Sequence, residues 1–262
     1  MDARPRVRQA RRMVSPEVPA PYRRLDFNGP LSGERAGRLI RSLGPLAGCR
    51  VVDLGCGWAE LLLRTLEAEP AATGAGVDLD TDLVARGRAN AAARGLADRV
   101  ELTAGDAAAW TGPPADAVFN VGAAHVWGGE PEAHTGNALA AVSRLLRPGG
   151  RLLFGECFWL REPTAAELSA MPVPPGQYRT LPDLVDLALA HGFRLLALSQ
   201  ASLDEWDDFE SGHARRWEDW LGENSASPDA SEVREKADSH LRARLHSMRE
   251  TVGFAYLTLV RV

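Results

Sequence analysis

Short apolar segments with strand character alternate with helical segments along most of this chain, beginning near residue 49. The expected strands cover residues 50–54, 74–79, 100–104, 117–121, 151–155, 193–198 and 253–260. Asp80 or Thr81 can cap the helix after the second strand and Thr180 a later one, and Gly95 and Gly192 are expected to end these helices. Such alternation predicts a parallel α/β sheet with helices on both faces. A length of 262 residues with 45% hydrophobic content suits one globular domain of this kind.

Two segments depart from the alternation. Residues 1–48 precede the first strand and include an expected helix over residues 32–43. We expect residues 1–20, which are rich in arginine without a following apolar stretch, to form a mobile basic arm rather than a secretory signal. Residues 202–250 begin with a Ser202–Glu205 capping box and carry two apolar stripes at helical spacing. The sequence thus predicts a single domain over residues 21–262 with a helical lid insert over residues 202–250.

The sharpest local signal is Gly55-Cys56-Gly57, which directly follows the first strand. Glycines at this position allow a tight turn and let a ligand approach the backbone closely. Asp78 ends the second strand, where a carboxylate can accept hydrogen bonds from both hydroxyls of a ribose. Asp106 follows the third strand and is placed to receive the amino group of an adenine. Helix capping or turn formation is the alternative role of both carboxylates.

A nicotinamide dinucleotide is the competing ligand for such a loop. Its binding motif needs a third glycine close to the pyrophosphate, and this chain has Glu60 at that position. A carboxylate there repels a pyrophosphate but accepts hydrogen bonds from an ammonium group, and Asp53 inside the first strand has the same preference. The expected ligand is therefore an adenosine with a cationic amino-acid tail.

Four successive motifs resemble those of the class I S-adenosylmethionine-dependent methyltransferases. They are residues 51–57 (VVDLGCG), 76–79 (GVDL), 105–107 (GDA) and 146–150 (LRPGG). Residues 121–129, 155–159 and 205–210 resemble a bacterial small-molecule subgroup of that class. The resemblance covers residues 50–160 closely and departs from the family at Ala59, where glycine is usual. It implies a seven-stranded Rossmann-like sheet of order 3-2-1-4-5-7-6 with strand seven antiparallel, and S-adenosylmethionine as cofactor. The implied cofactor contacts are the glycine loop, Asp78, Leu79, Asp106, Ala107 and Asn120.

The acceptor is expected at the carboxyl ends of the parallel strands, where ligands of such sheets bind. His125 follows the fourth strand and Glu156 the fifth, and both are candidate general bases. A packing histidine and a satisfied buried carboxylate are the alternatives. The residues expected to bind the substrate are Trp127, Trp159, Tyr178, Trp206 and Phe209. The last two belong to the insert, whose alternative role is a dimer interface.

Charge and composition narrow the class of partner. A net charge of −5, without a basic stripe, argues against nucleic acid, and residues 120–123 lack the Pro-Pro motif of base-methylating enzymes. No apolar run is long enough to cross a membrane. Three scattered cysteines indicate neither disulfides nor a metal site and suit a reducing cytoplasm.

We therefore expect a cytoplasmic enzyme, monomeric or homodimeric and without a metal, that methylates a small molecule. The alternatives are a non-methylating enzyme that uses the same cofactor, such as a cyclase, and a non-catalytic cofactor-binding protein.

Overall fold

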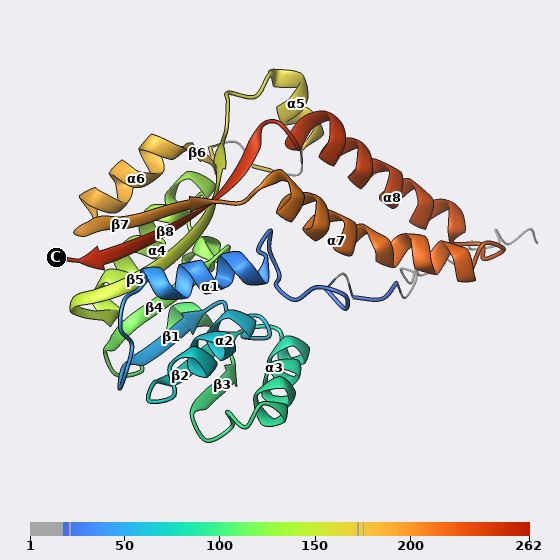
Figure 1. The fold of residues 1–262 in the computed structure, drawn as a ribbon. Helices are drawn as coiled ribbons and strands as arrows, with labels where there is room; N and C mark the ends of the chain where they lie inside the picture. Colours follow the sequence, from blue (N-terminus) through green and yellow to red (C-terminus); the bar gives the residue numbers. More distant parts are fainter. Residues whose placement is uncertain (1–17, 21, 172, 175) are drawn as a thin grey trace, which may run out of the picture.

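The computed structural model describes residues 18–20, 22–171, 173–174 and 176–262. Most of the expected basic arm, residues 1–17, lies outside the described residues. An eight-stranded sheet forms the centre of the molecule, and its main path runs β3-β2-β1-β4-β5-β8-β7 (Figure 1). The strands of this path are β1 (Arg50–Leu54), β2 (Thr73–Asp78), β3 (Val100–Ala104), β4 (Ala115–Val121), β5 (Leu146–Trp159), β7 (Phe193–Gln200) and β8 (Val252–Arg261).

The predicted strand order is confirmed, because β7 and β8 are the sixth and seventh of the expected strands. β8 runs antiparallel to both β5 and β7, and the pairs among β1 to β5 are parallel. The extra strand, β6 (Arg179–Thr180), pairs with the end of β5. Two residues are too short to show a strand pattern, so the sequence does not reveal it.

β5 extends further than the sequence predicts. Its antiparallel pairing with β8 continues past Gly155, so that Glu156 pairs with Ala255 and Trp159 with Val252. Glu156 and Trp159 therefore lie within the strand rather than after it, which corrects the expected boundary. Regular alternation of the strand places successive side chains on opposite faces of the sheet.

Helices cover both faces of the sheet (Figure 1). The helices α1 (Gly33–Ser42), α2 (Glu60–Ala68) and α3 (Thr81–Ala93) pack on one face, and α4 (His134–Leu145) and α6 (Leu181–Ala190) on the other. Predicted caps start two of them: Asp80 accepts hydrogen bonds from the first turn of α3, and Thr180 caps α6. A short helix, α5 (Ala165–Ala170), precedes β6.

The insert before the last strand forms the predicted helical hairpin, α7 (Leu203–Glu223) and α8 (Ala230–Ala243). It projects past the ends of the strands, and the N-terminal segment that leads into α1 runs along α7 (Figure 1). Arg24 contacts Asp219 of α7 at 3.1 Å. In the described part of the chain, no helix combines the length and the apolar character needed to cross a bilayer.

Glu205, in the first turn of α7, joins the insert to the N-terminal segment. Its carboxylate completes the capping box with Ser202 and also accepts hydrogen bonds from Ser32 and from Nε of Arg35, the latter at 2.7 Å. Burial opposes the charge of this carboxylate, but the hydrogen bonds from Ser32, Ser202 and Arg35 outweigh it and hold the pKa of Glu205 at about 2. The sequence predicts the capping box but not this long-range contact.

Candidate active site

The glycine loop is held by the neighbouring strand. The backbone N–H groups of Gly55 and Cys56 donate to the carbonyl oxygen of Val77 at 2.9 and 3.1 Å. The Asp78 carboxylate accepts the backbone N–H of Gly57 at 2.7 Å and that of Asp80 at 3.0 Å. Asp78 thus fixes the loop while it faces the space in front of it.

Three residues of the loop have left-handed backbone. The φ angles are 79° at Gly55, 55° at Gly57 and 58° at Ala59. Ala59 is the position at which the methyltransferase motif usually has glycine, and its left-handed conformation explains that preference. Alanine is accommodated there with its side chain buried in the core.

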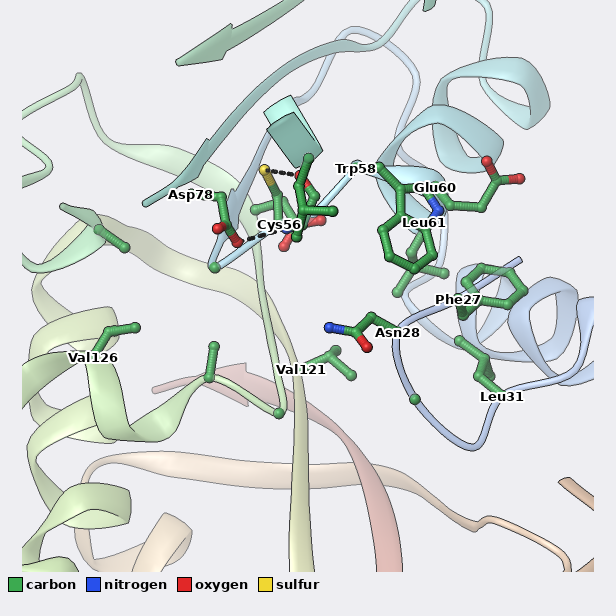
Figure 2. Close-up of a pocket in the computed structure, with 18 of the residues that line it drawn as sticks. Phe27, Asn28, Leu31, Cys56, Trp58, Glu60, Leu61, Asp78, Val121 and Val126 are labelled. Atoms are coloured by element: carbon green, nitrogen blue, oxygen red, sulfur yellow. Dashed lines mark hydrogen bonds between the residues drawn. The ribbon is translucent and has the colours of Figure 1, made fainter. Parts of the chain in front are cut away.

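A cavity of about 330 Å³ opens at the carboxyl ends of β1, β2 and β4, directly over the glycine loop (Figure 2). It brings together most of the predicted cofactor residues. Those in its wall are Asp53, Gly55, Cys56, Gly57, Glu60, Asp78, Leu79 and Ala107. His125, a predicted catalytic residue, also lines it.

The two carboxylates expected to face an ammonium group differ in their surroundings. Both oxygens of Glu60 are engaged, by Nε of Arg64 at 2.7 Å and Nη2 of Arg94 at 2.6 Å. Burial disfavours the charged form of Glu60, but these arginines outweigh it and lower its pKa. In Figure 2 the Glu60 carboxylate points away from Asp78. Glu60 therefore pairs with two arginines that do not themselves line the cavity, and both of its oxygens already accept hydrogen bonds.

Asp53 has no such compensation. Its side chain is buried, and it makes no hydrogen bond or ion pair with any residue in the described ranges. Burial, and after it the charge of Asp78, raises the pKa of Asp53 to about 8. A buried carboxylate without a partner is costly unless a cation or donor arrives to pair with it. Asp53 is thus the group in this cavity that most needs a positively charged ligand.

Asp106, Asn120 and Trp127 are predicted site residues that do not line the cavities. Asp106 is exposed and caps the short turn that follows β3 by accepting the N–H of Ala108 at 2.8 Å, the alternative role considered for it. Asn120 is completely buried and donates to the carbonyl oxygen of Leu54 at 3.0 Å, which ties β4 to β1. Trp127 packs against the core on the α4 side of the sheet. Ligand contacts of these three residues remain predictions.

A second cavity, of about 210 Å³, adjoins the first. The two share Asn28, Gly29, Gly122 and His125 in their walls. Gly122 directly follows β4 with a φ of 70°, and His125 follows on a short turn; both residues line the two cavities. His125 therefore borders both cavities, as a group acting between two bound molecules must.

The second cavity collects the other predicted residues. Glu156, Tyr178, Trp206 and Phe209 line it. Trp159 stands behind this wall, with its ring 5.2 Å from that of Tyr178. Burial raises the pKa of Glu156 to about 7, although a hydrogen bond from the Cys157 backbone partly offsets it. Trp206 and Phe209 bring α7 into this wall, and their contact with a substrate remains a prediction.

The N-terminal segment supplies residues that the motifs do not identify. Phe27, Asn28 and Leu31 close the first cavity opposite the glycine loop (Figure 2). Trp58 holds this segment through a 2.8 Å hydrogen bond from its indole to the Asp26 carbonyl oxygen. The sequence suggests that residues before the first strand help to cover the site, but no local pattern marks which of them do so.

Comparison with known proteins agrees with this geometry. A family model described as a methyltransferase domain matches residues 51–150, from β1 and the glycine loop into β5. A methyltransferase from Geobacter sulfurreducens, crystallised with S-adenosylhomocysteine, superposes with a TM-score of 0.82 at 26% identity, over 92% of this chain and 96% of that one. A second such complex, from Thiobacillus denitrificans, gives 0.82 at 27% identity over the same shares. Residues 51–150 thus match a methyltransferase domain, and the chain as a whole has the fold of S-adenosylmethionine-dependent methyltransferases.

Within that class the resemblance to one bacterial protein extends along nearly the full length. The uncharacterized protein YjhP of Escherichia coli is 28% identical over 237 residues, which are 89% of this chain and 93% of YjhP. The aligned region therefore extends beyond the methyltransferase motifs into the N-terminal segment, the insert or both.

Proposed function

We propose that the first cavity holds S-adenosylmethionine and that the second holds a small-molecule methyl acceptor. The observation that carries this proposal is the shared wall of the two cavities at Gly122 and His125. Methyl transfer needs a nucleophile in line with the sulfonium and shielded from water, so positioning and exclusion of solvent supply much of the rate. Two adjoining cavities under the N-terminal segment and α7 meet that requirement.

The residues of the first cavity fit the proposed cofactor. Asp78 offers carboxylate oxygens with free lone pairs to the ribose hydroxyls, while it keeps its bonds to the loop. Asp53 supplies the unpaired buried carboxylate that an amino-acid ammonium group would satisfy. Gly57 leaves open backbone in front of the loop, since a Cβ there would contact only Leu83, at 4.0 Å. When bound, S-adenosylmethionine provides an electrophilic methyl group on a positively charged sulfur.

His125 and Glu156 are the proposed catalytic groups, and their positions suggest different parts. His125 borders both cavities and is placed to take a proton from an acceptor that approaches the methyl group. Glu156 lies in the wall of the second cavity alone. It is placed to hold the acceptor or to receive its proton, and its pKa of about 7 allows either form near neutrality.

The second cavity supports a small molecule rather than a polymer as the acceptor. A volume of about 210 Å³ accommodates a metabolite of modest size, and the net charge of −5 does not favour a nucleic acid. We place the enzyme in the reducing cytoplasm, in keeping with its three free thiols, and expect a monomer or homodimer.

Isothermal titration calorimetry tests the cofactor assignment. We expect S-adenosylhomocysteine to bind with a dissociation constant on the order of micromolar. Because the pKa of Asp53 is about 8 without ligand, pairing it with an ammonium group at pH 7 should release a proton. Titrations in two buffers of different ionisation enthalpy measure that release.

Two variants sharpen the test. Asp53→Asn should weaken binding by about 1.5–3 kcal/mol, the scale of hydrogen bonds to charged groups, and should abolish the proton release. Asp82→Asn, at an exposed position of α3, is the matched control and should behave as the wild type. Binding of a nicotinamide dinucleotide together with no binding of S-adenosylmethionine or S-adenosylhomocysteine would refute the assignment.

A further inference from the structure

The second cavity has an unusual balance of charge. Its described wall includes one carboxylate, Glu156, and the aromatic rings of Tyr178, Trp206, Phe209 and Phe254. Neither arginine nor lysine occurs among the described residues that line it. An anionic ligand would therefore approach the half-buried Glu156 carboxylate with no arginine or lysine in the described wall to offset the repulsion, an arrangement that costs free energy.

The Glu156 carboxylate is only half satisfied by the protein. Its Oε1 accepts the backbone N–H of Cys157 at 2.9 Å. Its Oε2 has no hydrogen-bond or ion-pair partner anywhere in the described chain. Buried carboxylates normally pair with several donors, so a ligand that donates to Oε2 would complete this group.

The neighbours of Glu156 leave its charge uncompensated. Burial raises the pKa of Cys157 and of Tyr178, and both side chains therefore stay neutral near pH 7. The guanidinium of Arg244 lies 5.2 Å from the ring centre of Trp206, but it is paired with Asp207 and does not line the cavity. Two histidines, His125 and His134, also line the cavity, and Nε2 of His134 donates to the carbonyl oxygen of Gly129 at 3.2 Å.

The aromatic side chains add a second attraction for a positive charge. The ring centres of Trp206 and Phe209 are 6.1 Å apart, and those of Trp206 and Phe254 are 6.5 Å apart, so the three rings form a continuous surface. The negative faces of aromatic rings attract ammonium groups, most strongly where water is excluded. A carboxylate beside such rings is the combination that recognises organic cations.

We propose that the methyl acceptor is a compact molecule that carries a positively charged nitrogen, and that Glu156 determines this specificity by pairing with that nitrogen. Because a positively charged nitrogen has no free lone pair, a different, uncharged atom of the same molecule would receive the methyl group. The proposal rests on the proposed function, since it assigns the second cavity to the acceptor. A cationic nitrogen against Oε2 satisfies the carboxylate, while its carbon substituents fill the aromatic wall formed by β8, α7 and Tyr178. The cavity of about 210 Å³ limits the acceptor to a small molecule.

Matched probes of equal shape test the charge requirement. Protein saturated with S-adenosylhomocysteine is titrated with choline and with its neutral carbon analogue, 3,3-dimethylbutan-1-ol. A third titration uses the anion 3,3-dimethylbutanoate. We expect choline to bind about tenfold or more tightly than the neutral alcohol, and the anion to bind most weakly.

The preference for choline should depend on Glu156. Glu156→Gln keeps the shape of the side chain but removes its charge, so choline and the alcohol should then bind within about twofold of each other. Glu162→Gln, on an exposed position after β5, should retain the full preference. Equal binding of choline and the alcohol to the wild type, preferred binding of the anion, or an unchanged preference in Glu156→Gln would each overturn the proposal.

Failure of this inference can be separated from failure of the proposed function. The titration with S-adenosylhomocysteine comes first and reports on the first cavity alone. Absence of that binding removes the proposed function. Normal binding of S-adenosylhomocysteine without a preference for choline removes only the assignment of a cationic acceptor.

Discussion

Gly55→Ala is expected to destabilise the protein more than Gly57→Ala, although both glycines lie in the same loop with left-handed backbone. A Cβ atom at Gly55 would clash with the Cβ of Ala123, whereas one at Gly57 would meet only Leu83, at 4.0 Å. Ala123 is buried in the wall of the first cavity, shortly after β4. The backbone at Gly55 therefore lies so close to Ala123 that no side chain fits between the two loops.

The expected losses of folding free energy follow from the left-handed backbone at both glycines and from the steric clash at Gly55. Left-handed backbone costs an alanine about 1–2 kcal/mol, and the reduced entropy of the unfolded chain returns about 0.4–1 kcal/mol. Gly57→Ala should therefore cost about 1 kcal/mol of folding free energy. Gly55→Ala adds overpacking, which typically costs about 1–3 kcal/mol, so its total should be about 2–4 kcal/mol.

Urea unfolding of the ligand-free protein measures both variants, and a double-mutant cycle isolates the steric term. Ala123→Gly removes the clashing methyl group, so the double variant Gly55→Ala/Ala123→Gly should recover about 1–3 kcal/mol relative to the sum of the single changes. Equal losses for Gly55→Ala and Gly57→Ala, or strictly additive losses in the cycle, would show that the loops are not in contact as described.

Three further outcomes are expected. Asp78→Ala should weaken S-adenosylhomocysteine binding by about 1.5–3 kcal/mol in calorimetry. Thermal melts of the variant show whether the glycine loop has also loosened. An unchanged affinity would mean that Asp78 does not contact the ligand. The pKa of Glu205 is about 2 in the fold and 4.5 as its ordinary value, so stability of about 3 kcal/mol should be present above pH 4.5 and be lost as the pH falls towards 2. Acid titration of unfolding should show a smaller loss over that range in Glu205→Gln, and a parallel curve contradicts this reasoning. Trp206→Ala should impair binding of acceptor probes while S-adenosylhomocysteine affinity and the mass by light scattering stay unchanged; a changed mass with probe binding retained assigns α7 to assembly.

The sequence predicts the parts of the fold that local chemistry controls. Alternating strands and helices predicted the α/β sheet, whereas its strand order came from the resemblance to the methyltransferases; Asp80, Thr180 and the Ser202 capping box begin helices as expected. Glycine spacing located the first cavity, because left-handed backbone at Gly55 leaves few alternatives to glycine.

Features that depend on contacts between distant segments of the chain could not be predicted from local sequence patterns. The length of β5 is set by its partner β8, and hence Glu156 lies within a strand although glycine precedes it. Both oxygens of Glu60 are taken by Arg64 and Arg94, and the latter comes from the end of a different helix. A carboxylate with a suitable position can thus be neutralised by residues that no local motif connects to it.

The substrate-binding residues were predicted from their positions near the ends of strands and in the insert, not from a recognisable motif. Residues after β4 and on β5 gather at the cavity because parallel strands share one edge. Trp127 nevertheless turns into the core near α4, since a short helical turn redirects the chain after His125. The residues from Phe27 to Leu31 carry no motif, and only the folded chain shows that they close the first cavity.

A crystal structure with S-adenosylhomocysteine tests the central claim most directly, through the position of the ligand's sulfur atom. The account predicts the ribose at Asp78, the amino group at Asp53, and the sulfur facing the second cavity between Gly122 and His125. A sulfur atom directed away from that cavity, or a closed wall between the two cavities, would contradict the assignment of donor and acceptor sites.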